Sequence, residues 1–224
     1  MAFLSFLALI ASIDSSAPGA APAIAHADYR FGYDTAAAQS GPGTGTMNVD
    51  IGPAMPDGGV TISATDDWWN SVRPRATNSC EVYPNGNVTC LQRPYDLSPM
   101  QLVLFPMLGS NYFHGLSDAG NGTWTQSYRV SRGDIYLWDC VFKMRGLGLV
   151  KGANSLFGID VLGSASQIGG HYRGGDFQQH IYYDREVGLP AIVEDEHARL
   201  PQTNVYNTDY VELRLIRASP AKTD

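Results

Sequence analysis

The chain has 224 residues, of which 44% are hydrophobic and 17% are charged, and its formal net charge is −7. This composition supports a folded core and excludes a wholly disordered chain. The 15 basic residues are scattered and outnumbered by 22 acidic ones, which argues against a nucleic-acid-binding protein.

The first 27 residues have the pattern of a secretion signal. An apolar run over residues 2–11 is too short to span a bilayer but matches the hydrophobic part of a signal peptide. Small residues follow and end in an A-x-A motif at residues 25–27. We therefore expect cleavage before Asp28, a single β-rich domain over residues 28–224, and a periplasmic or extracellular location. No basic residue precedes the apolar run, so a buried N-terminal helix is the alternative.

Apolar residues that alternate with period two predict antiparallel strands in most of the remaining chain. Residues 47–51 and 60–65 both show this alternation, and the Gly-rich turn between them predicts a hairpin. The same reasoning predicts further strands over residues 123–130, 135–145, 155–163, 178–184, 189–197 and 210–217. Short connections that contain Gly or Pro favour a meandering antiparallel sheet.

The strongest local pattern lies between two cysteines. Pro84, Asn85 and Gly86 suit a three-residue hairpin loop, and counting outwards from this loop places Cys80 opposite Cys90. Facing cysteines in an oxidising compartment should form a disulfide. Two free thiols or a metal-binding pair are the alternatives, although the additional ligands of a zinc site are missing.

A short apolar helix is predicted over residues 98–108. Ser98 can cap its N terminus, and Gly109 can end it. Pro106 lies inside and should kink or shorten the helix. Because the helix is apolar on nearly all sides, it must be buried, most simply across one side of a curved sheet.

Residues 135–145 are predicted to form a central strand of the core. The even positions, which include Trp138, Cys140 and Phe142, are all apolar or aromatic. Cys140 has no predicted partner, so a nucleophile or an intermolecular bridge is conceivable. Its position on this apolar face instead favours a buried, inert thiol.

Residues 66–70 place two carboxylates beside two indoles. Trp68 and Trp69 can stack on a sugar ring while the carboxylates bind its hydroxyls, and acidic side chains at Glu194 or Glu196 would assist. Packing of a strand end into the core explains the segment equally well, and the acidic run at 194–196 is typical of a solvated strand end. No catalytic or metal-binding motif is recognisable, which favours a non-enzymatic protein without a cofactor or metal.

Residues 179–196 resemble a hairpin of exported bacterial half-barrel proteins of the lipoprotein-carrier type, many of which have unknown functions. The shared pattern is an aromatic strand, a short Asp-x-x-x-Gly turn and a following strand. The resemblance implies an open, curved sheet around an apolar hollow. It transfers no functional residue.

Together these patterns predict a mainly β protein, a curved antiparallel half-barrel or open barrel with one short helix. The expected function is that of an exported binding, carrier or envelope-assembly protein whose partner is a lipid or another apolar small molecule. No transmembrane span is expected in the mature chain. A carbohydrate-binding or carbohydrate-active module at residues 66–70 and a purely structural envelope protein are the alternatives. The candidate ligand-binding residues are Trp68, Trp69, Leu102, Phe105, Trp138 and Phe142.

Overall fold

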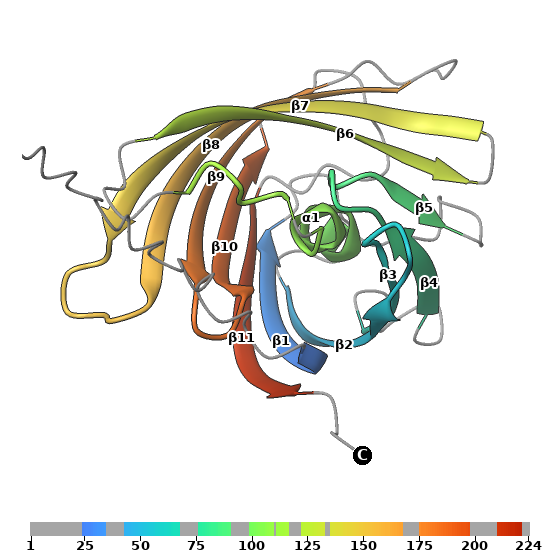
Figure 1. Cartoon of the computed structure of the whole chain (residues 1–224), viewed down its shortest axis with the longest axis horizontal. Coiled ribbons are helices and arrows are strands. Elements are labelled where there is room, and N and C mark those ends of the chain that lie inside the picture. Colours follow the sequence, from blue (N-terminus) through green and yellow to red (C-terminus); the bar gives the residue numbers. More distant parts are fainter. Residues whose placement is uncertain are drawn as a thin grey trace, which may run out of the picture.

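Eleven strands form a closed barrel around one helix (Figure 1). The computed structural model describes residues 24–34, 43–67, 76–90, 99–109, 111–116, 122–132, 135–167, 175–197 and 210–220. The strands are β1 (Ile24–Asp34), β2 (Gly43–Ala54), β3 (Val60–Asp66), β4 (Ala76–Val82), β5 (Val88–Cys90), β6 (Thr123–Arg132), β7 (Ile135–Leu149), β8 (Leu156–Gln167), β9 (Gly175–Asp184), β10 (Leu189–His197) and β11 (Tyr210–Pro220). The helix α1 spans Pro99–Met107.

Each strand pairs with the strands before and after it in sequence, and all of these pairs except β5 with β6 are antiparallel. This order is that of a meander, in which consecutive strands become neighbours. The chain between β5 and β6 includes α1, and a connection of this length allows β6 to run parallel to β5. The predicted mainly β fold, with a curved antiparallel sheet and one short helix, is confirmed.

The sheet curves further than a half-barrel and closes because β1 pairs with both β2 and β11. Alternate residues of β1 point inward, and Ala27, Tyr29 and Phe31 are each 1% exposed. This strand is not among those expected from the sequence, since part of β1 lies inside the predicted signal segment. Closure removes the open sheet edges that an unclosed sheet would expose.

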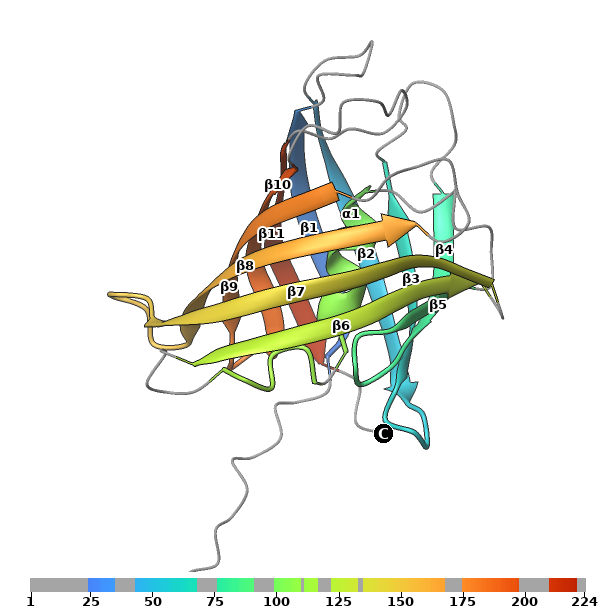
Figure 2. The ribbon, with the colours of Figure 1, turned by 90° about the horizontal axis from the view of Figure 1, so that it is seen from above.

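The helix α1 lies inside the ring of strands in both views (Figures 1 and 2). Its side chains Leu104, Phe105 and Met107 are buried. Polar contacts also hold it, because Asn78 Nδ2 on β4 donates to Gln101 Oε1 at 2.7 Å and Gln101 Nε2 donates to the carbonyl oxygen of Ala64 on β3 at 3.4 Å. The buried, apolar helix that the sequence predicts is therefore confirmed, and Pro106 lies within its last turn.

The hairpin between β4 and β5 has the predicted register. Cys80 pairs with Cys90 across the strands, and the two cysteines form a disulfide. Gly86 adopts a φ of +84°, the left-handed conformation that the hairpin loop requires of its third residue. The local sequence thus determines both the turn and the cross-link.

Inner and outer positions alternate along the strands as predicted. Met47 and Val49 of β2 are buried, and so are Cys140, Phe142 and Met144 of β7. Cys140 is a free thiol, and burial raises its pKa to about 12, so it stays protonated at neutral pH.

Candidate functional site

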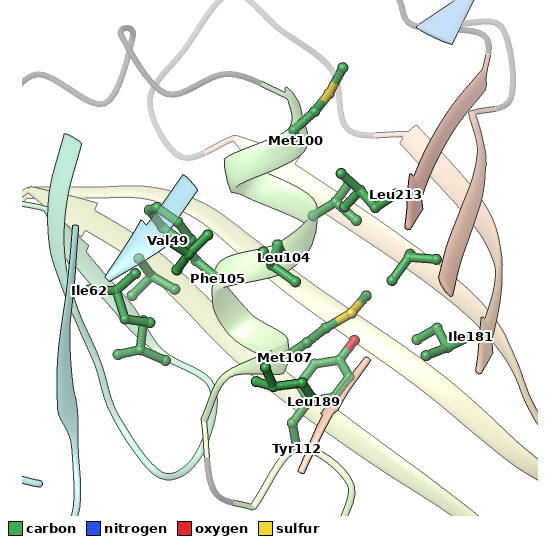
Figure 3. Packing of buried hydrophobic residues seen from close by; sticks show 14 of the residues in the cluster. Val49, Ile62, Met100, Leu104, Phe105, Met107, Tyr112, Ile181, Leu189 and Leu213 are labelled. Carbon is green, nitrogen blue, oxygen red and sulfur yellow. The ribbon is translucent and has the colours of Figure 1, made fainter. Parts of the chain in front are cut away.

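The centre of the barrel, where the sequence analysis expected a ligand hollow, contains α1 and its packing partners (Figure 3). Phe105 of α1 and Phe142 of β7 belong to the same buried core and are 1% and 3% exposed. The side chains of Leu102 and Trp138 lie outside the described part of the structure. Trp68 and Trp69 also lie outside the described residues, as does most of segment 66–70.

A groove of about 650 Å³ lies on the outer wall of the barrel, where β6, β7, β8 and β9 run side by side (Figure 2). Its lining follows from the strand register, which aligns outward-facing residues in two rows across the four strands. The first row is Thr123, Arg145, Asp160 and His180, and the second is Thr125, Lys143, Leu162 and Gln178. The inward-facing neighbours of these residues are buried and hold the wall in place.

The first row contains an ion-pair network centred on Asp160. Arg145 Nη2 donates to Asp160 Oδ2 at 2.5 Å, and His180 Nδ1 lies 2.7 Å from Oδ1. Because an ionised carboxylate only accepts, the His180 nitrogen is the donor. Burial by itself raises the pKa of Asp160, but the hydrogen bonds from Arg145 and His180 outweigh it and lower the pKa below its ordinary value. Asp160 therefore uses both oxygens to fix its two neighbours.

The second row places a cation among apolar side chains. Lys143 is exposed and lies directly opposite Leu162, which is 62% exposed. Val141 precedes Lys143 on the same face of β7 and is 43% exposed. No carboxylate among the described residues pairs with Lys143. Its ammonium group is thus available to an anion from outside the chain.

Exposed apolar residues concentrate on this side of the molecule. Four of the five large hydrophobic side chains that are exposed in the described part lie on β7 or β8, and the fifth is Ile216 on β11. Basic residues accompany them, and residues 140–151 contain three basic residues and no acidic one. We call this surface the β7–β8 outer face and define it as Val141, Lys143, Arg145, Leu147, Leu149, Lys151 and Leu162. A local excess of positive charge and leucine is unusual for a chain whose net charge is −7.

Sequence reasoning missed most of the groove. The alternation in β7 identifies its apolar inner face and gives no reason to select Lys143 and Arg145 on the outer face. Asp160 and His180 come from two further strands, and only the register brings them together. The expectation for the acidic run 194–196 was wrong at its middle position. Asp195 is 1% exposed, because it lies on the same inward face of β10 as Val193.

No family model, curated protein or solved structure matches the chain. The resemblance to half-barrel carriers therefore stays a prediction. Among the described residues, no helix combines the length and hydropathy needed to cross a membrane. The described residues also include no group of three or more potential metal ligands.

Proposed function

We propose that this chain is a non-enzymatic, exported binding protein and that its ligand is an anionic amphiphile, a molecule with one negatively charged group and an apolar chain. The ligand would lie on the β7–β8 outer face rather than inside the barrel. The observation that supports this most is the position of Lys143, which lies between Leu162 and Val141 at the groove and has no carboxylate partner among the described residues.

Each part of the amphiphile has a matching group on the protein. A carboxylate or phosphate would accept charge-assisted hydrogen bonds from Lys143, and such a bond contributes about 1.5–3 kcal/mol. The hydroxyl of Thr125, opposite Lys143 on β6, offers a further donor. The apolar chain would cover Leu162 and Val141, since burying apolar surface contributes roughly 25 cal/mol per Å².

Two other polar side chains of the groove, Arg145 and His180, are already ordered. Asp160 fixes Arg145 and His180, so these side chains lose little freedom when a ligand binds. The wall behind them is rigid because its inner face packs on the core that surrounds α1. A preorganised wall that presents Lys143 without a carboxylate partner among the described residues is suited to binding, and its side chains form no recognisable catalytic arrangement.

The proposed location outside the cytoplasm has independent support. The Cys80–Cys90 disulfide is typical of proteins from oxidising compartments. Free amphiphiles that leave an envelope membrane need a protein surface to bind them in water, and the outer face supplies apolar area for this purpose.

Dye displacement can test the proposed function. We expect decanoate to displace an anionic, polarity-sensitive dye from the folded protein, and its neutral analogue 1-decanol to do so at least tenfold less well. Lys143→Gln should weaken decanoate binding about tenfold, and Leu162→Ser about fivefold. Ile216→Ser removes an equally exposed apolar side chain from β11 and should leave binding unchanged. Equal decanoate affinity in the wild type and in both groove variants would refute the proposal.

A further inference from the structure

The hairpin that joins β7 to β8 ends in an exposed tip with apolar and basic side chains. Leu147 and Leu149 are 54% and 50% exposed, and Lys151 is exposed as well. We call residues 147–151 the hairpin tip. It is the end of the β7–β8 outer face that extends beyond the groove, since none of its residues lines the groove.

Backbone hydrogen bonds fix the shape of the hairpin tip. The N–H of Val150 donates to the carbonyl oxygen of Leu156 at 2.8 Å, and the N–H of Ala153 donates to that of Val150 at 3.0 Å. Gly152 adopts a φ of +84°, which lets the chain reverse directly after Lys151. Lys151 therefore lies at the apex of the turn. Figures 1 and 2 show this turn at the end of β7 and β8 that projects away from α1.

The two leucines of the hairpin tip are held in place but not covered. A Cβ on Gly158 would lie 3.4 Å from Leu147, so the Leu147 side chain packs over this glycine. Leu149 pairs with Phe157, beyond a shift of register within residues 146–148. About half of each leucine nevertheless remains in contact with water. Transfer of this surface to an apolar environment is favourable.

The charge of the hairpin is opposite in sign to that of the whole chain. Residues 140–159 contain Lys143, Arg145 and Lys151 and no acidic residue, whereas the net charge of the chain is −7. The hairpin tip thus attracts anions, while the rest of the surface repels them.

Acidic side chains occur at the base of the hairpin. Asp184 pairs with Leu156, where β8 begins, and Glu186 lies on the turn that follows β9. Arg185 belongs to the same turn, and its backbone N–H donates to the carbonyl oxygen of Ser155 at 3.1 Å. This bond ties the hairpin to its neighbour. The negative charges therefore lie at the base, and the apex carries only the positive charge of the lysine.

We propose that the hairpin tip docks on the surface of a lipid bilayer that contains anionic headgroups. Leu147 and Leu149 enter the boundary between headgroups and acyl chains, and Lys151 contacts the headgroup phosphates. An anionic bilayer matches both properties of the tip, because it offers apolar carbon beneath a negatively charged surface. The same surface repels the remainder of the acidic chain, which orients the molecule with the tip first.

A second copy of the chain fits the hairpin tip less well. In a twofold contact the same surface patch meets itself, so the basic side chains of two tips would lie side by side. The docking goes beyond the proposed function, since it uses no residue of the groove. It would bring the groove close to a membrane that supplies amphiphiles.

Flotation with lipid vesicles can test the docking. We expect the folded protein to bind vesicles of phosphatidylglycerol and phosphatidylcholine in roughly equal parts at least tenfold more tightly than vesicles of phosphatidylcholine alone. Leu147→Ser/Leu149→Ser should weaken binding to the anionic vesicles at least tenfold, and Lys151→Gln about fivefold. The matched control Ile216→Ser removes a comparably exposed apolar side chain from β11 and should leave vesicle binding unchanged.

Any of four results would overturn this inference. They are no binding to anionic vesicles, equal binding to both kinds of vesicle, and binding that survives in Leu147→Ser/Leu149→Ser. The fourth is a dimer in sedimentation that this double variant dissociates, because it would assign the tip to a contact between copies. Decanoate displacement is a separate readout of the groove, so vesicle docking and amphiphile binding can fail independently.

Discussion

The two faces of β7 differ completely although the same backbone carries them. Inward-facing Phe142 and Met144 are 3% and 2% exposed, whereas their outward neighbours Val141 and Lys143 are exposed. The inner face follows the ordinary rule for a core strand, and the outer face violates the expectation of a polar surface because leucines and a valine accompany its cations. Apolar side chains on the outer face, where polar ones are expected, are therefore more informative about function than the buried inner face.

Truncation of the inner face should have the largest effect on stability. The Phe142 ring lies directly over Gly163, where a Cβ would approach within 2.0 Å of the ring, so the glycine leaves the room that the ring occupies. Phe142→Ala should destabilise the fold by about 3–5 kcal/mol, while Val141→Ala should change it by about 0.5 kcal/mol or less. The denaturant midpoints of the two variants measure this difference in stability. Similar midpoints for the two variants would show that the faces are not distinct.

The hairpin that contains the disulfide shows the same difference between inner and outer faces. Cys80 and Cys90 face inward, whereas the next pair, Glu81 and Thr89, faces outward. The bridge closes a loop of about ten residues, and its removal should lower stability by roughly 2–3 kcal/mol. A Cys80→Ser/Cys90→Ser variant should remain folded but melt earlier. Peptide mapping of the wild type under non-reducing conditions should recover the Cys80–Cys90 link, and a link to Cys140 would contradict the register.

Removal of the first residues of β1 should have a smaller effect on stability. Ile24, His26 and Ala27 pair with β11 or β2, and Ala27 is buried. A chain that begins at Asp28 should therefore be less stable than one that begins at Ile24, by roughly 1 kcal/mol and hence about 2–4 °C in Tm. Equal melting temperatures would show that these four residues do not contribute to the barrel.

Processing before Asp28 stays a prediction. A second A-x-A motif at residues 21–23 ends immediately before β1, and cleavage there would leave the whole strand in the mature chain. N-terminal sequencing of exported protein distinguishes the two positions. A mature chain that still begins at Met1 would contradict export by a cleaved signal.

The smallest predicted effect concerns His26 on the outer face of β1. The hydrogen bond with Asp50 and the interactions with Asp28 outweigh burial and raise the pKa of His26 above 6.5. The stabilisation of the fold by protonated His26 is therefore fully present below pH 6.5 and is lost as the pH rises through the raised pKa. His26→Gln should lose about 0.5 kcal/mol or less at pH 6 and nothing at pH 9. A stability difference between the wild type and His26→Gln that is the same at pH 6 and pH 9 would contradict this assignment.

Most of the fold was predictable because each strand is encoded locally. The period-two patterns located nearly all strands, and the Pro84-Asn85-Gly86 loop determined the register that joins Cys80 to Cys90. Closure was not predicted, because it depends on β1, whose alternation over Tyr29 and Phe31 was visible but lay beside the apparent signal segment.

The groove was less predictable because it forms between strands. The groove network links Arg145, Asp160 and His180 from three strands, and no spacing in the sequence reveals that they align. The buried pair of Gln179 and Asp195 was hidden for a related reason. An acidic residue at a strand end usually faces solvent, and only the position of the neighbouring strand shows that this one does not.

A spin-labelled fatty acid, combined with methyl NMR spectra, can locate the amphiphile directly. If the β7–β8 outer face binds it, the label should broaden the methyl resonances of Leu162 and Val141. The resonances of Ile181 in the core and of Ile216 on β11 should stay sharp. Broadening that begins at Ile181 would place the amphiphile inside the barrel and contradict binding on the outer wall.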